Sequence, residues 1–220
     1  FARENGSYIS VGGGRLIAKN YDSMWTNSEK ARIDVNMITD ADGNVTDAGN
    51  NPVEIEGHAT TMTTWYGTGG IINIGLTTGD SKFTGEFAGA GTQNMWLRNG
   101  AVWNNTGIVY NPWSGSNYIS DISSHVTWLH GGNDKSSAGN IIQNSASDLY
   151  IDNLDGCTKL FMEHDLNYVV PEFAKNPDGS DKVDKDGNKI KNEDAGQKKI
   201  FGKLGNVIIA KAHKREGKNS

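Results

Sequence analysis

The chain has 220 residues, of which 35% are hydrophobic, 28 are glycine and four are proline, and its formal net charge is −5. Six Trp, seven Tyr and six Phe residues, together with the small net charge, exclude a disordered chain. The slight excess of acidic over basic residues gives no reason to expect nucleic acid as a partner. The expectation that remains is a folded, turn-rich, all-β protein.

Short β-type segments recur along the chain, each bounded by Gly, Asn, Asp or Ser, and long helical periodicity is absent. The clearest are residues 70–76, 94–98, 101–103, 125–129, 140–143, 148–152, 158–163 and 205–210. Many alternate apolar with polar residues, which predicts strands with one buried face. Their spacing favours a parallel β-helix of seven to ten turns, at roughly 20–30 residues each. We expect Asn residues to adopt the left-handed conformation at turns, to bond neighbouring turns, or to stack in ladders.

Two polar segments interrupt this pattern, residues 40–47 and 176–196. Asp42-Gly43-Asn44 and the run at 185–188 are typical hairpin-turn sequences, so both segments are predicted to protrude as loops. Residues 213–220 are polar and basic and are expected to fray. The whole chain is otherwise interpreted as one domain.

A calcium site is one interpretation of the first loop. Asp40, Asp42, Asn44 and Asp47 place oxygen ligands at intervals that resemble the first half of a calcium-binding loop. The twelfth position is Asn51 instead of the bidentate Glu that such a loop needs, so an exposed turn is the alternative.

Ligand-binding candidates come from two groups of residues. Trp103, Trp113 and Tyr118 lie in or near Gly/Asn/Ser-rich stretches, where they either pack in the core or form an exposed platform for a ligand or glycan. Acidic residues of the second loop, Asp178, Asp184 and Asp186, alternate with lysines and are weaker candidates.

Catalytic motifs are not found in the sequence. The five histidines form no His-Glu-x-x-His motif and no Gly-x-Ser-x-Gly motif is present, so no catalytic residue, resident metal or cofactor is assigned. Carboxylates around two neighbouring strands (Asp148, Asp152 and Asp155; Glu163 and Asp165) could reach a glycosidase-like separation, which keeps a carbohydrate-active enzyme as an alternative. The single Cys157 is interpreted as a small structural residue.

A series of segments resembles a known family. In order they are VEIEG (53–57), GLTTGDSKFTG (75–85), MWLRNGAVW (95–103), SSHVTWLHGG (123–132), GNIIQN (139–144), LYIDNLDG (149–156) and LGNVIIAKA (204–212). They resemble the passenger repeats of type V autotransporter adhesins, especially those of Veillonella-like Gram-negative anaerobes. The 176–196 insertion departs from that pattern.

The resemblance implies a right-handed parallel β-helix that is exported through an outer-membrane β-barrel and displayed on the bacterial surface or released from it. It implies a non-enzymatic adhesin that mediates self-association, biofilm formation, or binding to host cells, matrix, glycans or other bacteria. A passive stalk segment is the alternative within the family. Because the chain begins with Phe and carries no signal peptide, we expect it to be an excised passenger segment.

Overall fold

The computed structural model describes residues 1–4, 6–61, 69–106, 108–111, 116–119, 123–162, 166–174, 176, 180–202 and 204–214. For residues 19–21, 108–111, 116–119, 166–169 and 198–202 it describes the backbone alone. The described residues form β-strands, turns and irregular segments without helix, so the all-β prediction is confirmed.

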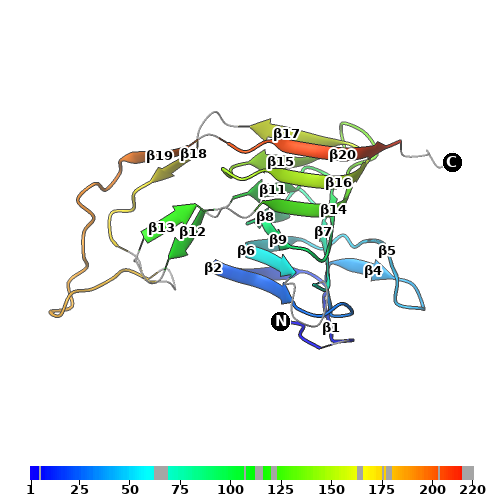
Figure 1. The fold of residues 1–220 in the computed structure, drawn as a ribbon, viewed down its shortest axis with the longest axis horizontal. Coiled ribbons are helices and arrows are strands. Elements are labelled where there is room, and N and C mark those ends of the chain that lie inside the picture. Colours follow the sequence, from blue (N-terminus) through cyan, green and yellow to red (C-terminus); the bar gives the residue numbers. More distant parts are fainter. Residues whose placement is uncertain are drawn as a thin grey trace.

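Two parallel sheets make up most of the fold (Figure 1). In spatial order, the first sheet contains β1 (Tyr8–Val11), β3 (Arg32–Val35), β7 (Ile71–Leu76), β10 (Thr92–Leu97), β14 (Ser124–His130), β16 (Leu149–Asp155) and β20 (Val207–His213). The second contains β17 (Thr158–Met162), β15 (Gly139–Gln143), β11 (Val102–Asn105), β8 (Lys82–Thr84), β6 (Val53–Thr61) and β2 (Gly14–Thr26), and β9 (Phe87–Gly89) also pairs with β6. The chain passes alternately between the two sheets.

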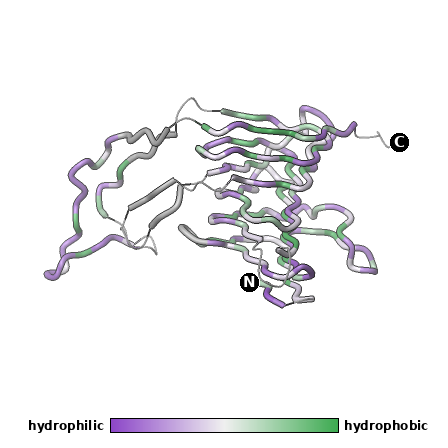
Figure 2. The backbone as a smooth tube through the Cα atoms, viewed as in Figure 1, coloured by the Kyte–Doolittle hydropathy of each residue, from purple (hydrophilic) through white to green (hydrophobic). Residues whose placement is uncertain are grey.

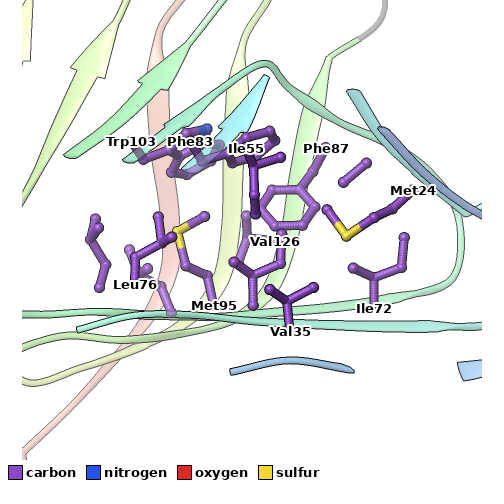
Figure 3. Packing of buried hydrophobic residues seen from close by; sticks show 14 of the residues in the cluster. Met24, Val35, Ile55, Ile72, Leu76, Phe83, Phe87, Met95, Trp103 and Val126 are labelled. Atoms are coloured by element: carbon purple, nitrogen blue, oxygen red, sulfur yellow. The ribbon is translucent and has the colours of Figure 1, made fainter. Parts of the chain in front are cut away.

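Each predicted segment contributes a strand to these sheets, and the expected alternation is seen in β15 but not in β7, β17 or β20. The two sheets face one another across a shared core of buried hydrophobic side chains. Figure 3 shows Trp103, Phe83 and Ile55 of the second sheet opposite Leu76, Met95 and other residues of the first. Within each sheet the inward residues are in register, for example Ile55 with Phe83 and Phe83 with Trp103.

Asparagines hold two of the turns as expected. Asn36 and Asn99 both adopt positive φ, at 56° and 53°. The Asn36 side-chain amide donates to three backbone carbonyls, those of Gly49, Asn51 and Gly75, at 2.9–3.1 Å. Because a short amide side chain tolerates the left-handed region and satisfies backbone acceptors there, Asn is favoured at these positions.

In the part of the chain that the structure describes, three antiparallel hairpins project from the two-sheet core: β4 (Met37–Thr39) with β5 (Val45–Ala48), β12 (Ile108–Asn111) with β13 (Ser116–Ile119), and β18 (Leu166–Val169) with β19 (Lys198–Gly202). The β4–β5 hairpin is inserted where the chain passes from the first sheet to the second. The other two hairpins are inserted where the chain passes from the second sheet back to the first, and Figure 1 shows them on the other side of the core.

The predicted loop at 176–196 is the outer part of the third hairpin. We call residues 166–202 the arm. Beyond β18 and β19, isolated antiparallel bridges join Phe173 to Lys191 and Val183 to Lys189, and the arm is largely hydrophilic (Figure 2). The expectation of fraying from residue 213 is wrong for His213, which is the last residue of β20; residues 215–220 lie outside the described residues.

Candidate binding groove

The outward face of the first sheet carries a polar ladder. Asp34, Asn73 and Asn94 occupy one register position on the consecutive strands β3, β7 and β10. Asn73 Nδ2 donates to Asp34 Oδ1 at 2.7 Å, and Asn94 Nδ2 donates to Asn73 Oδ1 at 2.8 Å. Arg32 Nε donates to both Asp34 oxygens, at 2.8 and 2.9 Å, so the first carboxylate is charge-paired. That pairing raises the pKa of Arg32 above its ordinary value.

An aromatic stack continues from this ladder. Trp96 stacks on His130 with ring centroids 4.4 Å apart, and Trp128 stacks on His130 at 5.5 Å. Trp128 also stacks on His213, at 5.1 Å. His130 Nδ1 lies 2.7 Å from Asp155 Oδ2, which orients the imidazole from the neighbouring strand β16.

The β4–β5 hairpin lies against this face and closes a groove of about 360 Å³. We call it the hairpin groove. Its lining comprises Val45, Thr46 and Asp47 of the hairpin, and Asn73, Asn94, Trp96, Arg98 and His130 of the first sheet and its ends. Gly75 permits this arrangement, since a Cβ there would lie 2.5 Å from the Asn36 carbonyl oxygen and 2.7 Å from Ala48 Cβ.

An ion pair ties the hairpin to the sheet. Arg98 Nη1 donates to Asp47 Oδ1 at 2.8 Å, and Arg98 Nε donates to the Gly131 carbonyl at 3.1 Å. The Arg98 side chain is 16% exposed and that of Asp47 is 49% exposed. The groove wall is therefore held by a partly desolvated pair, and its charges are balanced.

The geometry of the first loop fits the turn alternative, and the calcium interpretation stays a prediction. The Asp40 carboxylate accepts hydrogen bonds from the backbone amides of Asp42 and Asn44, at 3.0 and 2.8 Å, and so closes the hairpin turn. These bonds, above all that from Asn44, hold the pKa of Asp40 below its ordinary value. Asp47 is paired with Arg98. Within the described residues, no group of three His, Cys, Asp or Glu side chains converges as a metal site would require.

Trp103 cannot form an exposed platform, so that interpretation is corrected. It is fully buried and stacks on Phe83, with centroids 6.2 Å apart, while its Nε1 donates to the Gly85 carbonyl at 3.0 Å. The cause is register: Trp103 occupies an inward position of β11. Trp113 lies outside the described residues, and Tyr118 is described only as backbone of β13.

The arm positions Asp184 and Asp186 at its outer turn. Asp184 Oδ1 accepts from the backbone amides of Asp186 and Asn188, each at 2.9 Å, so its carboxylate closes the turn. The Asn188 bond is the main reason that the pKa of Asp184 lies below its ordinary value. Asp186 is exposed, and Asp178 lies outside the described residues.

The carboxylates considered for a glycosidase bind other partners. Asp152 lies 3.0 Å from His125 Nε2, and Asp155 pairs with His130. Asp148 accepts from the Asn206 backbone at 2.7 Å. Glu163 and Asp165 lie outside the described residues.

Sequence reasoning singled out Asp47, as a candidate calcium ligand, and missed the other residues that line the hairpin groove. Asn94, Trp96 and Arg98 alternate along one strand and its end, so the period of two places them on one face. This period of two can be read from the sequence. The contribution of the hairpin cannot, because Asp47 and Arg98 are 51 residues apart.

Comparison of the chain with protein-family models, with curated proteins and with solved structures gave no match. In the part of the chain that the structure describes, no helix has the length and apolar character needed to cross a membrane.

Proposed function

We propose that this chain is a non-enzymatic binding segment of a bacterial surface adhesin, built as a right-handed parallel β-helix. The observation that carries the proposal is the pairing of two parallel sheets, joined alternately by the chain, with hairpins that project from both sides. Parallel strands joined by crossovers are almost always right-handed, which supports the handedness. The resemblance to autotransporter passengers supports display at the cell surface.

The architecture suits adhesion because it separates the scaffold from the contact surfaces. The parallel strands bury a narrow core, while the hairpins project from it. Several such segments in one surface protein, or many copies on one cell, would add weak contacts into avidity.

Binding is favoured over glycoside hydrolysis by the lining of the hairpin groove. Both routes of glycoside hydrolysis use two carboxyl groups that flank the scissile bond. Among the described lining residues Asp47 is the single carboxylate, and it is bound to Arg98.

The test is an attachment assay with the complete 220-residue chain. Beads coated with the folded chain are mixed with host cells, extracellular matrix and Gram-negative bacteria, and with one another. Beads coated with an unrelated protein of similar net charge are the control. Adhesion or bead clustering above this control supports the proposal.

Two results would overturn it. Release of reducing ends from polysaccharides by the chain would favour the carbohydrate-active enzyme. Absence of attachment to every surface tested would leave a passive stalk.

A further inference from the structure

The direction of the hydrogen bonds along the outward ladder follows from the chemistry of the Asp34 carboxylate. An ionised carboxylate only accepts hydrogen bonds, so the amide nitrogen of Asn73 must face Asp34. The Asn73 oxygen then faces the next strand, and Asn94 must turn its own nitrogen toward it. Every amide in the ladder therefore points its donor toward Asp34.

This direction leaves the oxygen of Asn94 facing the next strand, β14. Asn94 Oδ1 is buried and accepts no hydrogen bond within the described structure, and Asn94 lines the groove. The next residue at this register position is Trp128, so the amide ladder ends there. Buried polar atoms without partners are rare, and a small rotation of the Asn94 side chain toward the groove would let a bound molecule donate to this one.

The groove also offers donors and an apolar wall. Arg98 uses two of its five N–H groups on Asp47 and Gly131, and the exposed Thr46 hydroxyl, which donates to the Ile38 carbonyl at 3.3 Å, can accept a hydrogen bond. Val45 and Trp96 supply apolar surface. Interleaved donors, acceptors and apolar surface match a polyhydroxylated ring, whose hydroxyls donate and accept while its C–H groups pack on apolar side chains.

Charge decides which class of saccharide fits. The guanidinium of Arg98 faces the carboxylate of Asp47, and His130 faces the carboxylate of Asp155. With Arg98 paired to Asp47 and Asp155 beside His130, the groove has no excess of positive charge, so it has no field to attract a sulfated or otherwise polyanionic chain. Its volume of about 360 Å³ lies at the lower end of the roughly 300–1,000 Å³ of small-molecule sites.

We propose that the hairpin groove binds a neutral mono- or disaccharide unit of a glycan. Asn94 Oδ1 and Thr46 would accept or exchange hydrogen bonds with sugar hydroxyls, and Arg98 would donate to them. The inference deepens the proposed adhesive function, on which it rests, by naming the ligand class.

The test begins with the complete chain on an array of neutral, sialylated and sulfated glycans, followed by calorimetry with the best neutral oligosaccharide. Asn94→Ala removes the unpaired acceptor and leaves the Asn73–Asp34 bond in place. We expect roughly three- to tenfold weaker binding, the range for one hydrogen bond between neutral groups. Thr46→Val, on the exposed hairpin, is the second variant and should weaken binding to a similar degree.

The matched control is Asn153→Ala. Asn153 occupies the register position that continues from Asn94 through Trp128, but it does not line the groove. Its amide donates to the Thr127 carbonyl at 3.1 Å. This variant should bind the oligosaccharide with unchanged affinity.

The outcomes separate this inference from the adhesive function. Failure to bind any neutral glycan, preference for sulfated glycans, or full binding by both groove variants overturns the saccharide site. Beads that still adhere when the groove variants are used show that adhesion runs through another surface. A groove that binds its sugar on beads that do not adhere contradicts the adhesive function alone.

Discussion

Trp103 gives the sharpest test of the core. Its indole is fully buried between the sheets and packs against two phenylalanines, with centroids 6.2 Å from Phe83 and 5.5 Å from Phe87. Trp103→Ala removes this ring and leaves a cavity, and such truncations cost about 3–5 kcal/mol in the free energy of unfolding. In a domain of this size that corresponds to a fall of roughly 6–20 °C in Tm.

Trp103→Phe isolates the polar contribution. The ring stays aromatic, but the Gly85 carbonyl loses the indole donor that lies 3.0 Å away. An unsatisfied buried acceptor costs about 1–3 kcal/mol, so this variant should lie between the wild type and the alanine variant.

Urea unfolding followed by far-UV circular dichroism measures both changes. The matched control is Tyr150→Ala, an aromatic residue 39% exposed on the outward face of the first sheet, which should cost less than about 1 kcal/mol. If Trp103→Ala were as stable as the control while attachment in the bead assay fell, Trp103 would be a surface binding residue and the buried assignment would be refuted.

Three further predictions concern turns and protonation. Asn36→Ala should destabilise the fold by roughly 1–2 kcal/mol more than Asn36→Gly in urea unfolding, because both lose the amide but only alanine is strained at φ 56°. Burial lowers the pKa of His58, so the unfolded chain binds more protons and stability falls as the pH drops below about 6.5; His58→Gln should flatten that slope of Tm against pH. Hydrogen bonds led by that of the Ser136 hydroxyl lower the pKa of Asp134 to about 2, and Ser136→Ala should raise it in a carboxyl NMR titration.

The sequence predicts the later strands better than the early ones. The predicted segment 148–152, for example, alternates between buried and more exposed side chains and contributes to β16 of the first sheet. The 13-residue strand β2 carries polar residues throughout, and its register with β6 shifts between Ile17 and Asp22 and again before Met24. Such irregular pairing obscures a period of two, because each shift changes which side chains face the core.

Strand β6 shows a different reason for a missed element. Its side chains alternate between buried and half-buried along all nine residues, yet Glu54, Glu56 and His58 make the segment polar. Glu54 is paired with Lys82 at 2.9 Å and with Arg15 at 2.6 Å, both on neighbouring strands. Charges that find partners across strands are compatible with a sheet, but the partners are distant in sequence.

Turns were predictable where a single glycine or aspartate determines the conformation of the turn. Gly43 and Gly187 adopt positive φ at 81° and 85°, in hairpins that Asp40 and Asp184 close. The same aspartates were candidate ligands for a metal or partner. Sequence alone does not separate these roles, because a carboxylate that caps a turn and one that binds a ligand occupy similar Asp/Gly-rich segments.

The hairpin groove and the arm lie on opposite sides of the core, so the adhesive proposal has two separate candidate contact surfaces. The groove depends on the β4–β5 hairpin and the outward face of the first sheet, whereas the arm follows β17. Changes at distant sites without shared partners are additive to within a few tenths of a kcal/mol. If the arm contributes a second adhesive contact, combining Asn94→Ala with a change at the arm should lower attachment by the product of the separate effects. A combined effect no larger than that of Asn94→Ala alone would mean that the groove carries the contact and the arm does not.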